Sequence, residues 1–402
     1  MKVLLSAYAC EPGKGSEPGI GWHWAIEIAR RGHRVTVLTR ANNRANIEAG
    51  AAHCGFPANV EFAYYDLPGW VCALKRRLGV TLPYYAWWQW GAYRFATKLH
   101  SEHRFDLVHH ITFGAIRHFS FMGRLGLPFL LGPVGGGETS PFWLRWHTGW
   151  RGGLIDTLRD VANAGSRFDP IARQASRHAA AIYAKTPETL RVLPRECRSK
   201  AQWRLEMGSD YYGESAPASP VAEDRKRILF VGRFIYWKGM ALGLQVFARA
   251  LAADPALSLT LVGKGREEER WRRLAERLGV SNRVTWISWL PQPELQKLYA
   301  SHGLLLFPSL HDSSGSAVLE ALAHGLPVVC LKLGGPGVIV DDSCGRAIDT
   351  RHGSVDRLMN DMAQAILDFT ARPDAWAAAS ARARAATARW TWSDRVEGLG
   401  AY

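Results

Sequence analysis

The sequence predicts an α/β protein made of two doubly wound domains. Short apolar runs of strand length alternate with helical stretches, a rhythm typical of parallel sheets whose two faces are covered by helices. The rhythm restarts after residues 208–226, a polar, proline-bearing stretch typical of a linker. The length of 402 residues, 47% of them hydrophobic, also exceeds one domain of about 100 to 200 residues. We therefore expect two sheets, each in its own domain.

The first sheet is expected to contain five apolar runs, at 2–8, 33–39, 60–67, 105–112 and 128–134. The first run, with its single Lys and the following Cys10, resembles a lipoprotein signal. It is too short for one and a Gly-rich turn follows at once, so we interpret it as a buried strand. The sequence contains no uninterrupted run of about 18 apolar residues, so no transmembrane helix is predicted.

The second sheet is expected to contain five further runs, at 227–234, 257–265, 283–290, 303–309 and 326–332. The linker separates a first domain, residues 1–207, from a second domain that begins at residue 208. Ligands of doubly wound sheets bind beyond the carboxyl ends of the strands, where loops lead into helix N-termini. The loops that follow these runs are therefore the expected place of the chemistry.

The charge balance indicates an anionic partner. Lys and Arg outnumber Asp and Glu by 50 to 36, which gives a formal net charge of +14. Nucleic acid, acidic lipid and a phosphorylated small molecule all fit this excess. The six cysteines are scattered, with no CxxC pair and no zinc-type spacing, which fits a reduced, cytosolic setting.

Two segments combine basic residues with many of the 17 tryptophans: residues 74–99 and residues 140–153. Aromatic rings beside Lys and Arg suit docking on an anionic membrane, where each cation adds about 1 kcal/mol. The alternative is that Trp87, Trp88 and Trp90 are simply core residues. The sequence leaves both interpretations open.

Two Gly-rich loops follow runs of the first sheet. The loop at 10–22 departs from the GxGxxG spacing, and Arg40 stands at the end of the second run, where a dinucleotide site usually has an acidic residue, so NAD binding is disfavoured. The loop at 130–141 contains Gly135–Gly137 in succession. Three glycines either let the backbone approach a ligand closely or form a plain tight turn.

The loop at 231–240 carries two cations, Arg233 and Lys238, between a strand and a helix. An Arg fork and a Lys point charge together neutralise adjacent phosphates, although isolated surface cations are more often solvated. A second loop, HDSSGSAVLE, places Asp312 and Glu320 eight positions apart at the start of a helix. Asp312 and Ser313 are also good helix N-cap residues, which is the structural alternative.

These motifs, GRFIYWKG, LTLVGKG, the Asp312 to Glu320 loop and HGLPVV, resemble glycosyltransferase family 4 in order and spacing. The resemblance spans essentially the whole chain. It implies the retaining GT-B fold of sugar-nucleotide transferases, with two Rossmann-like domains facing each other across a cleft. It also implies a C-terminal helix, about 386–402, that crosses back to the first domain, so the second domain is 208–385 and Trp390 and Trp392 are structural anchors.

The resemblance assigns roles to individual positions. Glu320 binds the nucleotide ribose, the turn before the helix faces the donor's sugar and diphosphate, and Arg233 with Lys238 binds the diphosphate. Asp312 replaces the family's usual Glu and is shorter by about 1.5 Å, which puts donor choice in question. The implied donor-binding residues are Arg233, Lys238, Gly263, Asp312, Ser313, Ser314, Gly315, Ser316 and Glu320.

A His near the transferred sugar is common in this family, and here His109 and His110 compete for that role. Successive residues of a strand point to opposite faces, so only one of them is expected to face the cleft. The alternative is that they are ordinary core or surface histidines with satisfied hydrogen bonds. The implied catalytic residues are Asp312, Arg233, Lys238 and His109. The implied acceptor-side residues are Gly15, Ser16, Gly19, His110, Gly136, Gly137 and Glu138.

The predicted function is transfer of a hexose from a UDP- or GDP-sugar to a hydroxyl of a glycan or lipid-linked acceptor, in cell-envelope or exopolysaccharide synthesis. The enzyme is expected in the cytoplasm, peripheral at the inner face of the membrane, without a cofactor or metal. One alternative is a nucleotide-sugar epimerase of the same fold. Another is a basic nucleic-acid-binding protein, which no recognisable DNA- or RNA-binding motif supports.

Overall fold

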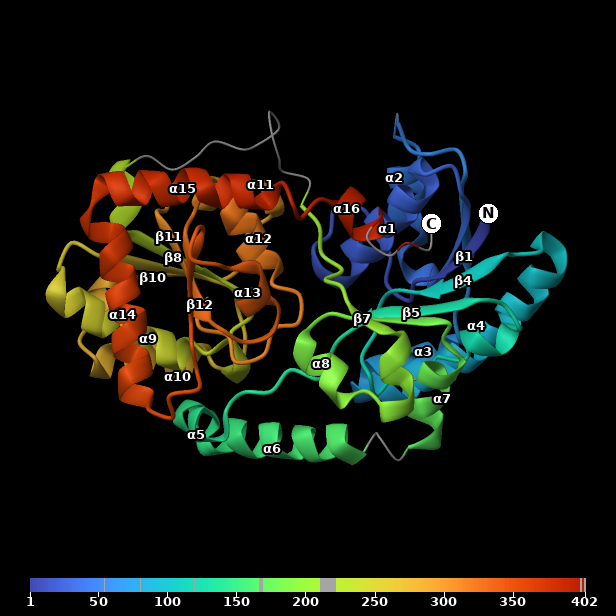
Figure 1. Ribbon diagram of the computed structural model, residues 1–402, viewed down its shortest axis with the longest axis horizontal. Coiled ribbons are helices and arrows are strands. Elements are labelled where there is room, and N and C mark those ends of the chain that lie inside the picture. The colour runs from blue at the N-terminus through green and yellow to red at the C-terminus, as the bar shows by residue number, and fades with distance from the viewer. Residues whose placement is uncertain are drawn as a thin grey trace. The chain divides into compact units, whose positions relative to one another are not determined.

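The computed structural model describes residues 1–53, 55–79, 81–118, 120–165, 169–209, 222–397 and 400. Most of the predicted linker and Cys54 lie outside these residues. The chain divides into two compact units (Figure 1). Unit 1 comprises residues 1–137, 161–207 and 392–402, and unit 2 comprises residues 138–160 and 208–391. Residues 138–160 and 386–391, expected in or with the first domain, thus group with unit 2.

Unit 1 is built on a seven-stranded parallel sheet with the strand order β3-β2-β1-β4-β5-β6-β7. Its strands are β1 (Lys2–Ser6), β2 (Arg34–Thr39), β3 (Val60–Tyr64), β4 (Leu107–His110), β5 (Phe129–Val134), β6 (Ala181–Ala184) and β7 (Ala201–Trp203). The first five fall within the predicted runs. Val3, Leu4 and Leu5 of β1 are fully buried, so the buried-strand interpretation of the N-terminus is correct.

The helices of unit 1 include α16 (Trp392–Glu397), the last helix of the described residues. The others are α1 (Ser16–Arg30), α2 (Arg44–Ala51), α3 (Gly69–Leu78), α4 (Leu82–His103), α7 (Pro170–His178) and α8 (Pro187–Val192). The α16 helix packs on α1, with the rings of His23 and Trp392 stacked 4.5 Å apart (Figure 1). The predicted return of the C-terminal helix to the N-terminal domain is confirmed.

Unit 2 contains a six-stranded parallel sheet with the order β10-β9-β8-β11-β12-β13. Its strands are β8 (Arg227–Val231), β9 (Ser258–Val262), β10 (Val284–Ile287), β11 (Leu304–Phe307), β12 (Val328–Leu331) and β13 (Gly345–Ile348). Its helices are α5 (Phe142–Arg145), α6 (Trp150–Gly165, whose last turn belongs to unit 1), α9 (Met240–Ala253), α10 (Glu268–Arg277), α11 (Gln292–Ala300), α12 (Ser316–Ala323), α13 (Gly334–Ile339), α14 (Val355–Ala371) and α15 (Pro373–Thr387).

Each sheet has a point where the strand order reverses, between β1 and β4 in unit 1 and between β8 and β11 in unit 2. Loops that leave the two central strands at such a point diverge to opposite faces and open a crevice. In unit 2, α9 packs against α10 and α14, while α12 packs against α13 and α15. The predicted class of two doubly wound α/β domains is confirmed.

The tryptophans divide between the core and the surface. Trp88 is fully buried, whereas Trp87 and Trp90 on the same helix are 48% and 42% exposed. Neither the core interpretation nor the surface interpretation therefore holds for all three. Among the described helices, none is long and apolar enough to span a membrane.

Candidate functional site

The two loops at the reversal point of unit 2 are joined by an ion pair. Lys238 Nζ, in the loop after β8, lies 2.5 Å from Asp312 Oδ2, in the loop after β11. Their side chains are 16% and 14% exposed, so the pair is shielded from water but still reachable. The structure thus brings together two predicted site residues that are 74 positions apart in the sequence.

Asp312 also shapes its own loop. Its Oδ1 accepts hydrogen bonds from the amides of Ser314 at 3.1 Å and Gly315 at 2.8 Å. Burial alone would raise the pKa of Asp312, but the Lys238 ammonium and these amides lower it, so the carboxylate stays ionised. No side chain caps α12, whose N-cap is Gly315, and the N-cap alternative for Asp312 and Ser313 is therefore wrong. The first amides of α12, beginning at Ser316, can receive an anion.

A glycine pair that the sequence interpretation overlooked supports this loop. The Gly335 amide donates to the Asp312 carbonyl at 2.8 Å. A Cβ on Gly334, whose φ is +58°, would lie 2.2 Å from the same carbonyl oxygen. Only glycine permits this approach. The signal was available, because LGGPG follows the run at 326–332 just as the other Gly-rich loops follow theirs.

Glu138, predicted on the acceptor side, belongs to unit 2. Its side chain is 5% exposed, and its Cγ is 3.5 Å from the position that a Cβ on Gly334 would take. Glu138 therefore lies beside the loops of the predicted donor site. Its acceptor-side role stays a prediction.

Arg233 and Gly263 differ in what they offer a ligand. Arg233 is exposed, with its guanidinium 6.0 Å from the centre of the Trp237 ring. A Cβ on Gly263 would lie 1.9 Å from the Gly232 carbonyl oxygen, so this glycine lets the loops after β8 and β9 touch. Arg233 is thus accessible to a phosphate. Gly263, by contrast, serves in its described contacts to let the two loops pack closely.

Glu320 lies in the second turn of α12 and accepts a hydrogen bond from the Tyr299 hydroxyl at 3.1 Å. Burial raises the pKa of Glu320 to about 7, although hydrogen bonds from Tyr299 and Gln292 oppose the rise. The carboxylate is therefore half-ionised near neutral pH. A ligand hydroxyl that donates to Glu320 would favour its ionised form.

A buried network that the sequence interpretation missed ties both loops to α6. Asp156 is 1% exposed and accepts hydrogen bonds from the Tyr236 hydroxyl and from His311 Nε2, each at 2.8 Å. Arg159 donates to His311 Nδ1 at 2.9 Å and to the Glu138 carbonyl. Tyr236 lies between Arg233 and Lys238, and His311 precedes Asp312. One carboxylate therefore positions the backbone on both sides of the ion pair.

The two histidines of β4 are buried on opposite faces of the first sheet, as predicted. His109 donates from Nε2 to the Gly132 carbonyl at 2.6 Å and meets the Trp24 ring edge-on, while His110 lies 3.3 Å from the Tyr85 hydroxyl. Burial lowers the pKa of His109 to about 4 and that of His110 to about 3. Both are neutral at pH 7 and enclosed within unit 1, and their catalytic and acceptor-side roles stay predictions.

The predicted acceptor-side glycines of unit 1 have different surroundings. Gly15 and Ser16 are exposed at the start of α1, and a Cβ on Gly15 would meet nothing within 4 Å. Gly19 is buried, and a Cβ there would lie 2.1 Å from the Lys14 carbonyl oxygen. Gly136 accepts from Asn163 at 2.8 Å, and the Gly137 amide donates to Thr189 at 3.2 Å. The glycines at 135–137 thus make close internal contacts.

A second missed cluster lies inside unit 1. The Lys185 ammonium is 2.7 Å from Glu206 and 3.1 Å from Glu17, and the side chains of Lys185 and Glu206 are 4% and 0% exposed. Burial would lower the pKa of Lys185, but the two carboxylates raise it above its usual value. Glu17 also accepts from the Phe113 amide at 2.6 Å. The cluster fixes the loops after β4 and β6 to the start of α1.

Within the described ranges, no group of three or more His, Cys, Asp or Glu side chains is arranged to hold a metal ion.

Comparison with known proteins identifies relatives of one class. Residues 213–382 match the family described as "Glycosyl transferases group 1". D-inositol 3-phosphate glycosyltransferase of Segniliparus rotundus is 30% identical over 234 residues, which is 55% of this chain but only 48% of that protein. The enzyme of the same name from Rhodococcus opacus is 25% identical over 429 residues, covering 97% of this chain and 86% of that protein.

Solved structures resemble the whole chain. HepE of Anabaena in complex with UDP aligns with a TM-score of 0.60 at 17% identity, over 100% of this chain and 98% of that one. WaaG, a glycosyltransferase involved in lipopolysaccharide biosynthesis, aligns with a TM-score of 0.59 at 18% identity, over 99% and 98%. The GT-B fold is thereby confirmed. The sequence matches support the prediction of a glycosyltransferase, which is taken up as a proposal below. None of these matches names family 4.

Proposed function

We propose that this chain transfers a hexose, with retention, from a UDP- or GDP-sugar to a hydroxyl of a glycan or lipid-linked acceptor, as an enzyme of glycosyltransferase family 4. The observation that carries the proposal is the Lys238–Asp312 pair at the reversal point of the second sheet. Near this pair, at a position where parallel sheets open a crevice, lie the uncapped first amides of α12 and the Glu320 carboxylate in the second turn of α12. The nucleotide-sugar relatives support this assignment, since HepE is described in complex with UDP and with UDP-glucose.

The proposed donor contacts follow from these positions. Lys238 and Arg233 neutralise the diphosphate and stabilise the charge that develops when the nucleotide leaves. The first amides of α12, those of Ser316 and Ala317, receive a phosphate oxygen, since the Val318 amide already donates to the Gly315 carbonyl. Glu320 accepts hydrogen bonds from the ribose hydroxyls. Asp312, whose oxygens already hold Lys238 and two amides, keeps the loop in the geometry that the donor needs.

The proposal is tested by measuring release of UDP, GDP or ADP from their sugar conjugates, with a panel of hydroxyl acceptors, with and without magnesium. Release from a UDP- or GDP-sugar that depends on an acceptor and not on magnesium supports transfer without a metal. Release only with magnesium would contradict the metal-free mechanism, and acceptor-independent conversion of the sugar would favour the epimerase alternative. Retention is read from the anomeric configuration of the product by proton NMR.

Peripheral attachment to an anionic membrane is part of the proposal and rests on unit 1. Trp70, Leu74 and Leu78 of α3 follow one another at four-residue spacing and are 63%, 45% and 59% exposed. The Trp70 ring meets that of exposed Trp87 at 5.9 Å. Such an apolar patch beside Lys and Arg suits a lipid interface. Cosedimentation with phosphatidylglycerol vesicles but not with phosphatidylcholine vesicles is expected, and equal sedimentation with both would contradict it.

A further inference from the structure

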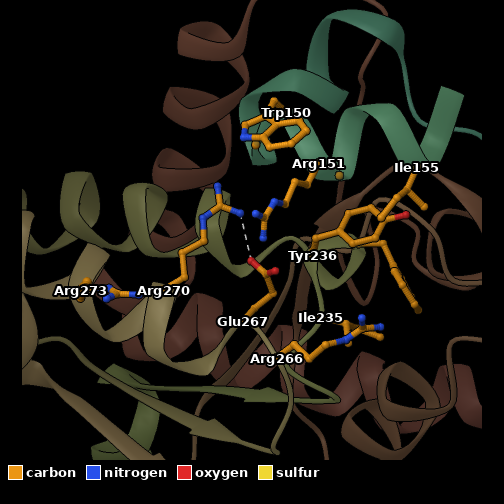
Figure 2. Close-up of a pocket in the computed structure, with 12 residues that line it drawn as sticks. Trp150, Arg151, Ile155, Ile235, Tyr236, Arg266, Glu267, Arg270 and Arg273 are labelled. Atoms are coloured by element: carbon orange, nitrogen blue, oxygen red, sulfur yellow. Dashed lines mark hydrogen bonds and ion pairs between the residues drawn. The ribbon is translucent and has the colours of Figure 1, made fainter.

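A pocket of 610 Å³ lies in unit 2 outside the ion pair described above (Figure 2). Its walls come from the start of α6, from residues 235–237 and from the loop and first turns that begin α10. Residues 235–237 are the segment between Arg233 and Lys238. The pocket therefore shares one wall with the loop that carries the proposed diphosphate-binding cations.

The pocket is strongly cationic. Four arginines line it, Arg151, Arg266, Arg270 and Arg273, against a single acid, Glu267. Glu267 pairs with Arg270 at 3.0 Å, as Figure 2 shows. Arg273 pairs with Glu269 at 3.1 Å, whereas Arg151 and Arg266 have no ion-pair partner within the described part of the chain. Guanidinium groups bind phosphate through paired donors, so this surplus of cations favours a phosphate-bearing ligand.

One wall of the pocket is fitted to a guanidinium. Gly149 has a φ of +117°, and a Cβ there would lie 2.5 Å from Arg270 Nη2. The Arg270 guanidinium therefore packs against the backbone of Gly149, and a side chain at position 149 would occupy the space that the guanidinium fills. This contact holds one arginine of the pocket close to the chain segment that begins α6.

An apolar stripe begins at the same pocket and runs along α6. Trp150 and Ile155, which line the pocket, are 66% and 49% exposed. Leu154 and Leu158 extend the stripe from Trp150 at successive four-residue steps and are 45% and 60% exposed. Residues four apart share a helix face. Exposed apolar surface of this extent beside a cationic pocket marks an interaction site for a molecule with both characters.

We propose that the pocket binds the phosphate of an anionic amphiphile, with its hydrocarbon chain lying along Trp150, Leu154 and Leu158. The arginines hold the head group, and the stripe removes the first methylenes of the hydrocarbon chain from water, which favours binding. This deepens the proposed function, on which it rests, by giving the lipid-linked acceptor a place beside the donor loop. A solvated arginine cluster alone would not account for the adjoining stripe.

The test is calorimetric titration of the full chain with farnesyl phosphate, farnesol and inorganic phosphate, each below its aggregation concentration. Farnesyl phosphate is expected to bind at least tenfold more tightly than either of the others. Arg270→Gln should weaken farnesyl phosphate binding about tenfold. The matched control is Arg272→Gln on the same helix, because Arg272 pairs with Glu268 and lies over the Trp286 ring outside the pocket. Its binding should equal that of the wild type.

A third variant separates the contribution of the ligand's hydrocarbon chain from that of its phosphate head group. Leu158→Ser should weaken farnesyl phosphate binding severalfold and leave phosphate binding unchanged. Equal binding of phosphate and farnesyl phosphate, or equal loss in Arg270→Gln and Arg272→Gln, would overturn the proposal. The titrations need no sugar-nucleotide donor, so the two proposed sites are tested independently. If farnesyl phosphate does not bind but UDP does, only the amphiphile site is rejected. If UDP does not bind but farnesyl phosphate does, only the donor site is rejected. Melting temperatures of all variants confirm that each is folded.

Discussion

The two units differ in how they use the polar residues in and just beyond their strands. In unit 1, Lys185, Glu206, His109 and His110 are buried, and Lys185 and Glu206 are paired with each other. In unit 2, Arg233 is exposed and the Lys238–Asp312 pair is partly accessible. The polar groups of unit 1 mainly satisfy one another, whereas those of unit 2 retain capacity for a ligand.

This difference indicates where stability and binding reside. A buried ion pair is costly to break, because the remaining charge loses both its partner and its water. A partly exposed cation beside uncapped helix amides gains a partner when an anion arrives. Substitutions at the strand ends of unit 1 should therefore reduce stability, and substitutions at those of unit 2 should reduce donor binding.

The largest effect is expected from Lys185→Met in unit 1. It leaves Glu206, which is fully buried, without its cation, and should lower the free energy of unfolding by about 3 to 5 kcal/mol. Urea denaturation measures this loss. Lys98→Met, at an exposed position of α4, is the control and should cost less than about 0.5 kcal/mol. If Lys185→Met lowers the free energy of unfolding by less than about 1 kcal/mol, the claim that the buried polar groups of unit 1 contribute to stability is wrong.

Glu320→Gln should separate stability from binding in unit 2. The pKa of Glu320 is raised from 4.5 to about 7, so ionising it costs stability as the pH rises through this range. The variant should be more stable than the wild type above pH 7, by up to about 3 kcal/mol, and equal to it below pH 4.5. UDP affinity of the wild type should rise from pH 6 to pH 8, because ribose hydroxyls favour the ionised carboxylate.

The control for Glu320→Gln is Glu294→Gln, which removes a carboxylate that is 50% exposed on α11. It should change neither the pH dependence of unfolding nor that of UDP binding. A pH-independent UDP affinity in the wild type would remove Glu320 from the nucleotide site.

Lys238→Ala should slow nucleotide release about 100-fold, or about 2.7 kcal/mol of transition-state stabilisation, since it deletes one cation at the developing charge. Initial rates with the best donor and acceptor measure it. Lys297→Ala, an exposed lysine of α11 paired with Glu294, should retain the wild-type rate. Equal rates in the two variants would show that Lys238, in the loop after β8, does not take part in nucleotide release.

Asp156→Asn tests whether the buried network positions the donor loops. The change weakens hydrogen bonds from Tyr236 and His311 to a charged acceptor, which should cost about 1.5 to 3 kcal/mol of stability. If Asp156 has only a structural role, the variant loses stability and its KM for the donor is unchanged. A positioning role also raises KM for the donor several-fold at temperatures where the variant is fully folded. Asp368→Asn, on the exposed face of α14, should leave KM unchanged.

The smallest effects distinguish two glycines at the start of α1, the N-cap residue Gly15 and Gly19 in its first turn. Gly15→Ala should change stability by about 0.5 kcal/mol or less, since the new Cβ meets nothing within 4 Å. Gly19→Ala should cost about 1 to 3 kcal/mol, because the Cβ would lie 2.1 Å from the Lys14 carbonyl oxygen. Thermal unfolding compares them. Equal effects would mean that the start of α1 is not packed as described.

The sequence predicted what local patterns determine. Apolar runs located most strands, but not β6 (AIYA), β7 (AQW) and β13 (GRAI). β7 and β13 are short and only weakly apolar, and β6 continues the alanines that follow α7, so no separate run marks it. The motifs placed Lys238 and Asp312 at strand ends, and the parallel topology then brings them together. Asp156 was not predicted because a single Asp in an amphipathic helix is usually solvated. Only the tertiary fold brings it to Tyr236 and His311, neither of which is near it in sequence.

The measurement that tests the central claim most directly is calorimetric titration of UDP, GDP and ADP into the wild type, Lys238→Ala and Lys185→Met at pH 8. We expect UDP or GDP to bind the wild type, binding to be weakened at least tenfold in Lys238→Ala, and Lys185→Met to bind normally at a temperature where it is folded. Loss of binding in Lys185→Met with normal binding in Lys238→Ala would contradict the account, because the nucleotide site would then belong to unit 1.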